Sequence, residues 1–191
     1  LEPARPACKI GRVPDTARKD TPRQIVVMRH AKAEQHGPSD FDRHLADRGV
    51  EEGALAGRWL VAQGFVPDHV LVSAALRTRE TWAAVADGAG WDADTIETDE
   101  NETLYEAGPE TALDLVREVP EDALALLVIG HNPTMGYLAQ LLDDGDGDED
   151  ASNALVMGYP TSAMTVFDLT GDWADLDEQG GTTRAHHVPR A

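Results

Sequence analysis

The sequence predicts an α/β domain, a three-layer sandwich with a mostly parallel central sheet and helices on both faces. The first observation behind this prediction is that strand-sized apolar segments alternate with helix-length segments from residue 24 onward. Strands that alternate with helices usually pair in parallel, because each helix returns the chain across one face of the sheet. The second observation is the composition. The chain has 191 residues, 41% hydrophobic and 27% charged, which suits one globular domain with a sizeable core.

The predicted strands are short runs of apolar residues that end in turns or polar groups. The strongest of these signals is the segment Leu-Ala-Leu-Leu-Val-Ile, which is followed directly by Gly130 and His131. Five strands are expected, at residues 24–30, 69–73, 95–98, 124–129 and 163–169.

The predicted helices have apolar residues at helical spacing and recognisable ends. In the first helix Leu55, Trp59 and Leu60 share one face, and Gly64 follows as a typical C-terminal residue. Pro109 fits the first turn of a later helix, where its missing amide hydrogen is not needed. Four helices are expected, at residues 46–63, 76–89, 109–119 and 134–142.

Both ends of the chain differ from the predicted domain, which spans residues 24–176. Four prolines interrupt residues 1–23, and we expect a flexible basic extension there, either disordered or lying on the acidic body. The first 24 residues hold six basic and three acidic side chains, a net charge of +3, against −19 for the whole chain. Residues 177–191 form a polar C-terminal tail that we expect to fray, with metal binding by His186 and His187 as the alternative.

The charge balance and the cysteine count constrain the partners and the location. With 16 basic and 35 acidic residues the surface repels nucleic acid, so we expect no such partner. The apolar runs are far shorter than the roughly 20 residues of a membrane span, so we expect no membrane partner either. The single cysteine, Cys8, excludes an intrachain disulfide and a cysteine metal site, and it fits a cytoplasmic location.

An acidic segment, residues 143–150, raises the question of a calcium loop. Asp144, Asp146 and Asp148 have the first three spacings of such a loop. Glu149, however, stands where the loop needs glycine, and Leu155 where it needs glutamate. We therefore expect a solvated, flexible loop and no metal site.

Cationic and imidazole side chains follow three of the predicted strands. Arg29 and His30 end the first strand, Arg77 follows the second, and His131 follows the fourth. Because the carboxyl ends of parallel strands meet at one edge of a sheet, we expect these side chains to converge on one crevice. A guanidinium group matches phosphate oxygens, and an imidazole can act as a nucleophile. The sequence therefore predicts a phosphoryl-transfer site.

Four segments around these residues follow one another at characteristic spacings. They are Val-Met-Arg-His-Ala-Lys-Ala-Glu at 27–34, Asp-Arg-His-Leu-Ala-Asp-Arg-Gly at 42–49, Ser-Ala-Ala-Leu-Arg-Thr-Arg-Glu-Thr at 73–81 and Ile-Gly-His-Asn-Pro at 129–133. In these segments the chain resembles the histidine phosphatase superfamily, in particular its SixA-type phosphohistidine phosphatase branch. The resemblance extends over about residues 24–169 and implies a phosphoglycerate mutase-like fold. Ala31 stands where the family usually has glycine.

The resemblance implies a role for each matching residue. His30 matches the nucleophile that becomes phosphorylated, and His131 matches the second histidine of the pocket. Arg29 and Arg77 match the arginines that bind phosphate. Arg43 begins the segment Arg-His-Leu-Ala, where the family usually has Arg-Pro-Leu-Thr. It is a candidate for phosphate binding or, equally, for an ion pair with a nearby acid.

The general acid is the least defined part of the predicted site. Family members that cleave phosphate esters use a carboxylic acid to protonate the leaving group. Glu102, Glu106 and Glu34 are candidates, but none lies in a distinctive motif. Imidazole leaves more readily than an alkoxide and can take up a proton at about pH 6.5. The absence of a clear acid therefore favours phosphohistidine or another activated substrate.

These expectations define a metal-independent phosphatase without a cofactor, which forms a phosphohistidine intermediate. Its expected substrate is a phosphohistidine of a protein, such as a phosphotransfer domain. One alternative is a phosphomonoesterase for a small phosphorylated metabolite or nucleotide. The other is a non-catalytic module that binds phosphorylated ligands, although the presence of both histidines and both arginines favours an enzyme.

Overall fold

The computed structural model describes residues 22–191. Of the predicted basic extension, residues 1–21 lie outside this part of the chain. Pro22 and Arg23 belong to the first strand, β1 (Pro22–Arg29), which begins two residues before the predicted boundary of the domain. These two residues pair with Thr170 and Leu169 of another strand, so they form part of the sheet.

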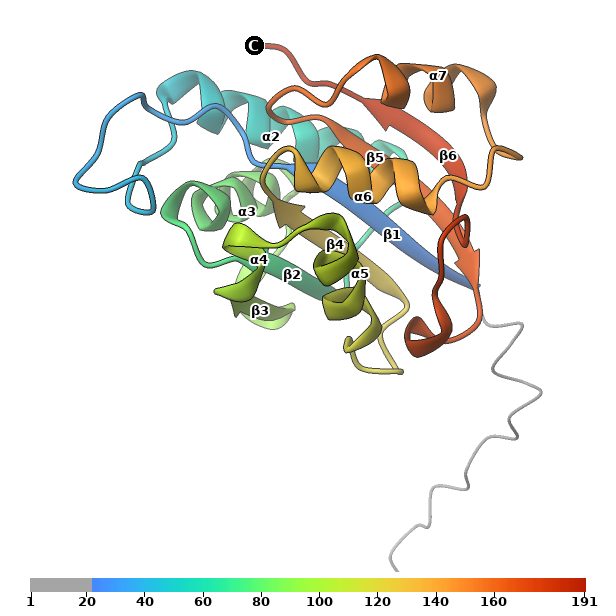
Figure 1. The fold of residues 1–191 in the computed structure, drawn as a ribbon. Coiled ribbons are helices and arrows are strands. Elements are labelled where there is room, and N and C mark those ends of the chain that lie inside the picture. The colour runs from blue at the N-terminus through green and yellow to red at the C-terminus, as the bar shows by residue number, and fades with distance from the viewer. Residues whose placement is uncertain (1–21) are drawn as a thin grey trace, which may run out of the picture.

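In the described part of the chain, six strands form one sheet in the order β3-β2-β4-β1-β5-β6 (Figure 1). Strands β3, β2, β4 and β1 run parallel to one another, while β5 and β6 are antiparallel to their neighbours. The remaining strands are β2 (His69–Ser73), β3 (Glu97–Asn101), β4 (Ala125–Gly130), β5 (Met164–Thr170) and β6 (Thr182–His187). The sheet is thus mostly parallel, as predicted.

The four predicted helices are present, together with two further α-helices and two 3₁₀ turns among the described residues. The helices are α2 (Asp47–Ala62), α3 (Leu76–Ala89), α4 (Thr103–Glu106), α5 (Pro109–Arg117), α6 (Thr134–Leu142) and α7 (Glu149–Met157), with 3₁₀ turns η1 (Ala93–Thr95) and η2 (Trp173–Asp175). Among residues 22–191, no helix combines the length and the apolar character needed to cross a membrane.

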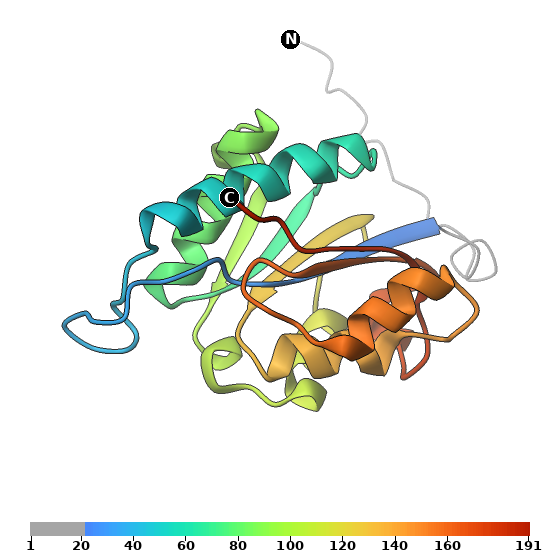
Figure 2. The ribbon, with the colours of Figure 1, turned by 90° about the horizontal axis from the view of Figure 1, so that it is seen from above.

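Strand β1 shows why helices cover both faces of the sheet. Alternate residues of a strand point to opposite faces. Ile25 and Val27 therefore join the core beneath α4 to α7, whereas Val26 and Met28 join the core beneath α2 and α3. All four side chains are fully buried. Figures 1 and 2 show the two helical layers on opposite sides of the sheet, which confirms the three-layer α/β sandwich.

The polar C-terminal tail departs from the expectation. Thr182–His187 does not fray but forms β6, an edge strand that pairs with β5. Main-chain hydrogen bonds, which need no apolar side chains, hold it there. Its polar side chains also find partners: the Thr183 hydroxyl donates to Asp143 over 2.7 Å, and the His187 ring stacks on Trp59 with centroids 4.9 Å apart. Among the described residues, no three or more His, Cys, Asp or Glu side chains gather in a way that could hold a metal ion.

The acidic segment is only partly the loop that we expected. Asp148 is the N-terminal cap of α7, since its carboxylate accepts a hydrogen bond from the amide of Ala151 over 2.8 Å. Glu149 and Asp150 occupy the first helical turn, where the helix dipole favours negative charge. These two acids are therefore helical residues, and the expectation of a loop is wrong for them.

Candidate active site

The carboxyl ends of β1, β2 and β4 lie side by side and build the site. The parallel register pairs Arg29 with Gly130 and Val72 with Ile129. The residues that follow these pairs therefore emerge at the same edge of the sheet. They are His30 after β1, the start of α3 after β2, and His131 after β4.

His30 is buried, and the main chain determines which of its ring nitrogens carries the proton. Its Nδ1 lies 2.7 Å from the carbonyl oxygen of Ala31. A carbonyl oxygen only accepts, so Nδ1 donates, and Nε2 keeps its lone pair in the neutral ring. Burial, reinforced by the positive charges of Arg77 and Arg29, lowers the pKa of His30 to about 4. The ring is therefore neutral at pH 7.

A hydrogen-bonded link joins the His30 segment to α3. The amide of Ala31 donates to the Thr81 hydroxyl over 3.0 Å, and that hydroxyl donates to the carbonyl oxygen of Arg77 over 2.6 Å. All three residues are buried. The link fixes the first turn of α3, and with it Arg77, relative to the end of β1.

His131 is the second histidine, and its ring centroid lies 5.2 Å from that of His30. Arg77 Nη2 donates to Nδ1 of His131 over 3.2 Å, so in the neutral ring Nε2–H donates to the Ser73 hydroxyl over 2.8 Å. Burial, together with neighbouring His30 and Arg77, lowers the pKa of His131 to about 3. His131 is thus neutral in this state. We expect a bound anion to hold His131 protonated.

Arg29 and Arg77 supply positive charge beside His30. Arg29 Nη1 donates to the carbonyl oxygen of Tyr159 over 3.0 Å, and no carboxylate of residues 22–191 pairs with this arginine. Arg77 is 4% exposed and donates from Nη1 to the carbonyl oxygen of Asp40 over 2.6 Å. The Nε atoms of both arginines are buried without an acceptor among the described residues. Each retains a hydrogen-bond donor for an anion.

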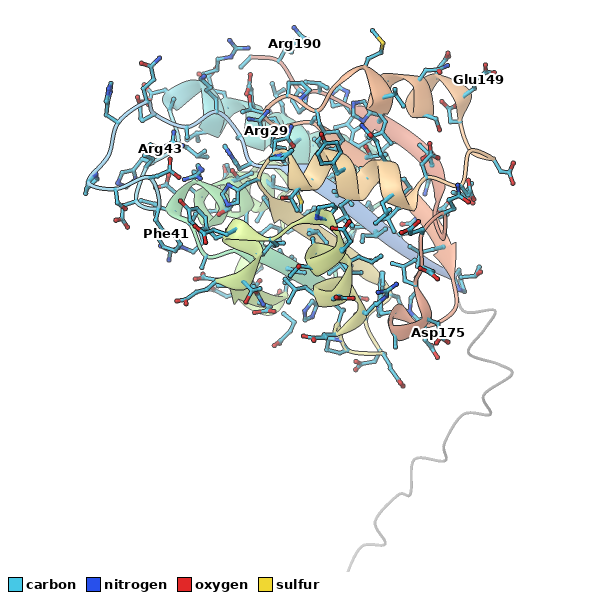
Figure 3. All side chains as sticks on the ribbon, viewed as in Figure 1. Arg29, Phe41, Arg43, Glu149, Asp175 and Arg190 are labelled. Carbon is cyan, nitrogen blue, oxygen red and sulfur yellow. The ribbon has the colours of Figure 1, made fainter. Side chains whose placement is uncertain are left out.

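Arg43 lies on the loop between β1 and α2 (Figure 3) and forms an ion pair. Its Nη2 lies 2.8 Å from Oδ1 of Asp40, and its Nη1 donates to the carbonyl oxygen of Glu34 over 2.8 Å. Of the two interpretations of Arg43 from the sequence, this structure contains the ion pair. Arg43 remains close enough to His30 to contribute to the lowering of its pKa.

Sequence reasoning missed Asp40 and Tyr105. The Tyr105 hydroxyl donates to Asp40 Oδ2 over 2.7 Å, and its ring meets the His131 ring edge-on at 5.2 Å. The Arg77 guanidinium lies 5.7 Å from the centre of the same ring. Asp40 precedes Arg43 by three residues, and Tyr105 stands between two of the candidate acids. In the sequence, these positions next to candidate site residues were the only indications that Asp40 and Tyr105 belong to the site.

None of the three candidate acids forms a hydrogen bond or an ion pair with a residue of the site in the described part of the chain. Glu34, Glu102 and Glu106 are exposed, and within residues 22–191 their carboxylates have neither a hydrogen bond nor an ion pair. The carboxylate that does adjoin the site belongs to Asp40. The hydrogen bond from Tyr105, with the charges of Arg43 and Arg77, lowers the pKa of Asp40 to about 2. Asp40 is therefore ionised at neutral pH and has no proton to donate.

A surface hollow of about 500 Å³ adjoins the site on the side of the loop that carries Arg43. It is lined by Gln35, His36, Gly37, Ser39, Asp40 and Arg43. Asp40 therefore contributes both to the wall of this hollow and to the contacts of Arg77.

Comparison with known proteins identifies similar proteins of one superfamily. The model of the histidine phosphatase superfamily (branch 1) matches residues 25–108. An uncharacterised protein of Mycobacterium tuberculosis is 39% identical over 165 residues, 85% of this chain and 100% of the relative. Phosphohistidine phosphatase SixA of Escherichia coli is 32% identical over 123 residues, 64% of this chain and 76% of that protein.

A solved structure supports the same assignment. The candidate phosphohistidine phosphatase SixA from Nakamurella multipartitia superimposes with a TM-score of 0.77 at 33% identity. The match covers 89% of this chain and 98% of that one. The resemblance seen in the sequence motifs is thereby confirmed: the chain belongs to the histidine phosphatase superfamily and, within it, to the SixA-type branch of phosphatases.

Proposed function

We propose that this protein is a metal-independent phosphatase that forms a phosphohistidine at His30, and that its substrate is a phosphohistidine of another protein. One observation carries the proposal. The Ala31 carbonyl oxygen fixes the proton of a neutral His30 on Nδ1, which leaves Nε2 as a nucleophile beside the half-buried Arg29 and the buried Arg77. A phosphotransfer domain is the kind of protein that presents such a substrate.

The first step transfers the phosphoryl group. The lone pair on Nε2 of His30 forms a bond to phosphorus, while the bond between phosphorus and the substrate imidazole breaks and its electron pair leaves with that imidazole. Arg29 and Arg77 neutralise the phosphoryl oxygens, which is where most of the catalytic effect in phosphoryl transfer arises. The phosphorylated ring of His30 is a cation whose Nδ1–H stays on the Ala31 carbonyl oxygen.

The second step is hydrolysis. A water oxygen bonds to phosphorus, the bond to Nε2 breaks, and its electron pair returns to the ring. His30 regains its neutral form with the proton still on Nδ1. The proton lost by the water passes to the solvent or to the phosphate product. No metal ion or organic cofactor enters either step.

The state of the carboxyl groups supports a substrate with a good leaving group. Asp40 is ionised, and the carboxylates of the exposed Glu34, Glu102 and Glu106 form no hydrogen bond or ion pair with the site residues. A phosphate ester needs a proton for its alkoxide, whereas an imidazole departs as a neutral molecule. The name of the Escherichia coli relative, phosphohistidine phosphatase, points to the same substrate class.

The test compares the wild type with His30→Ala in buffer that contains EDTA. The substrates are a phosphotransfer domain phosphorylated on histidine and, in parallel, p-nitrophenyl phosphate and a sugar phosphate. We expect the wild type to prefer the phosphorylated protein and His30→Ala to lose at least about 10³-fold in kcat/KM. Phosphorus NMR of acid-free, rapidly quenched wild type should show an acid-labile phosphohistidine.

Two outcomes would contradict the proposal. Equal rates for the wild type and His30→Ala would exclude a nucleophilic His30, and a rate that EDTA abolishes would exclude metal independence. A preference for the sugar phosphate would replace the proposed substrate by a small phosphorylated metabolite.

A further inference from the structure

Asp40 occupies an unusual position for a carboxylate, between two arginines at the edge of a predicted phosphate site. Its Oδ2 lies 3.1 Å from Arg77 Nη2, and its Oδ1 lies 2.8 Å from Arg43 Nη2. The Tyr105 hydroxyl also donates to Oδ2 over 2.7 Å. The Asp40 side chain is nevertheless 58% exposed, on the side of the hollow lined by residues of the same loop.

Arg77 can bind an anion without leaving Asp40. Its Nη1 and Nη2 atoms contact Asp40 and His131, whereas its buried Nε has no acceptor among the described residues. A phosphoryl oxygen that binds Nε would leave the carboxylate of Asp40 in its place. Asp40 then lies beside the bound phosphoryl group, and the negative charges of the two groups repel each other. A substrate with a positive, hydrogen-bond-donating group next to its phosphorus would relieve that repulsion.

We propose that Asp40 makes the site selective for phosphoryl groups attached to nitrogen, by accepting a hydrogen bond from an N–H of the leaving group in the adjoining hollow. This proposal rests on the phosphatase function proposed above and specifies its substrate class. The ligand class is the phosphoramidates, including phosphohistidine, whose leaving group carries a proton on nitrogen. Phosphate esters, whose leaving oxygen has no such proton, gain nothing from Asp40 and experience its negative charge.

Asp40 accepts no proton in this scheme. The leaving group enters as a cation, with its proton already on nitrogen. As the bond from phosphorus to nitrogen breaks, the electron pair of that bond stays on the leaving group, which departs neutral. The hydrogen bond to Asp40 stabilises the protonated, reactive form of the substrate, and His30 receives the phosphoryl group.

The test is the ratio of kcat/KM for phosphoramidate to kcat/KM for p-nitrophenyl phosphate, measured for the wild type and three variants. Asp40→Asn keeps the shape of the side chain and removes its charge, and we expect the ratio to fall at least about 10-fold. Asp40→Glu keeps the negative charge, and its ratio should lie closer to that of the wild type than to that of Asp40→Asn. Asp42→Asn is the matched control: it removes one charge from the same loop, but Asp42 hydrogen-bonds only to Ser39 among the described residues. Its ratio should stay within about twofold of the wild type.

The possible failures are distinct. If Asp40→Asn lowers both rates equally, Asp40 only positions Arg77 and the proposed selectivity is wrong. If Asp42→Asn lowers the ratio as much as Asp40→Asn, the effect is that of net charge, and the proposal is again wrong. A wild type that hydrolyses neither probe would overturn the phosphatase function itself. Circular dichroism of each variant serves as the control that its fold is intact.

Discussion

The two ends of β1 carry one buried or half-buried arginine each, and their surroundings differ. Arg23, at the amino end, is 4% exposed and has protein partners for both terminal nitrogens. It donates to the carbonyl oxygens of Gly171 and Glu121, forms an ion pair with Asp172 at 3.2 Å, and lies 5.8 Å from the Trp173 ring centre. Arg29, at the carboxyl end, has one carbonyl partner and no carboxylate partner in the described part of the chain. The first is neutralised by the protein, and the second keeps its charge for a ligand.

The larger of two surface hollows does not lie at the end of β1 that carries the uncompensated positive charge. A hollow of about 770 Å³ lies at the amino end of β1, lined in part by Arg23, Asp168 and Arg184. The hollow beside Asp40 and Arg43 measures only about 500 Å³. At the larger one Asp168 faces Arg184 at 3.9 Å, so that charges of both signs are present. The uncompensated cation, and not the space available, distinguishes the candidate active site.

The largest effect should follow from removing the uncompensated arginine. Arg29→Ala should lower kcat/KM for a phosphorylated substrate by about 10²- to 10³-fold, because one donor to the developing charge is lost. Arg29→Lys should lie between, since it keeps the charge but not the guanidinium fork. Steady-state kinetics measure both, and urea unfolding should show that neither variant is strongly destabilised. Full activity of Arg29→Ala would show that Arg29 does not serve a ligand, and the proposed difference between Arg23 and Arg29 would then be wrong.

The matching change at the other end should affect stability instead. Arg23→Ala leaves Asp172 and two carbonyl oxygens without their partner, which should lower the free energy of unfolding by about 3 kcal/mol. Well below the unfolding temperature, kcat/KM should stay within about twofold of the wild type. Urea titration and kinetics on the same preparation test this pair of statements. Loss of activity without loss of stability would place Arg23 in the site and break the comparison.

The smallest of these effects is the pH dependence of the free energy of unfolding that His30 contributes, directly after the carboxyl end of β1. The pKa of His30 is about 4 in the folded protein and 6.5 without the fold, so the unfolded chain binds the extra proton as pH falls through 6.5. The free energy of unfolding therefore falls with pH between 6.5 and 4, by about 2 kcal/mol at pH 5 for one such histidine. His30→Asn should lack this contribution, and Arg23→Ala should keep it. Urea titrations at pH 8, 6.5 and 5 measure it, and parallel curves for wild type and His30→Asn would contradict it.

Periodicity was sufficient to predict the layers of the fold but not its edge. The buried strands alternate between faces that are both apolar, and their sequences stand out from the turns around them. β6 (Thr182–His187) lacks this signal, because its pairing with β5 uses the main chain and its side chains bond to polar neighbours such as Asp143. The start of α7 was missed for a similar reason. Its acidic first turn resembles a solvated loop in the sequence, and only the cap at Asp148 distinguishes the two.

The residues of the site likewise divide into those that the strand pattern predicts and those that it does not. Arg29 ends a strand, and His30 and His131 directly follow strands, so the geometry of a parallel sheet is enough to predict that they converge. Asp40 and Tyr105 lie on a long loop and in the four-residue helix α4, whose paths depend on packing rather than on local pattern. Arg43 illustrates the limit. The sequence left phosphate binding and an ion pair equally open, and only the position of Asp40 decides between them in this state.

The Ala31 carbonyl oxygen that holds the His30 proton has a consequence for how the chain can change over time. Where a carboxylate side chain orients a reactive imidazole, one substitution is enough to misdirect the ring. Here the orienting atom is part of the peptide unit and is present whatever amino acid stands at position 31. A substitution at position 31 therefore changes the side chain there but keeps the oxygen that orients His30.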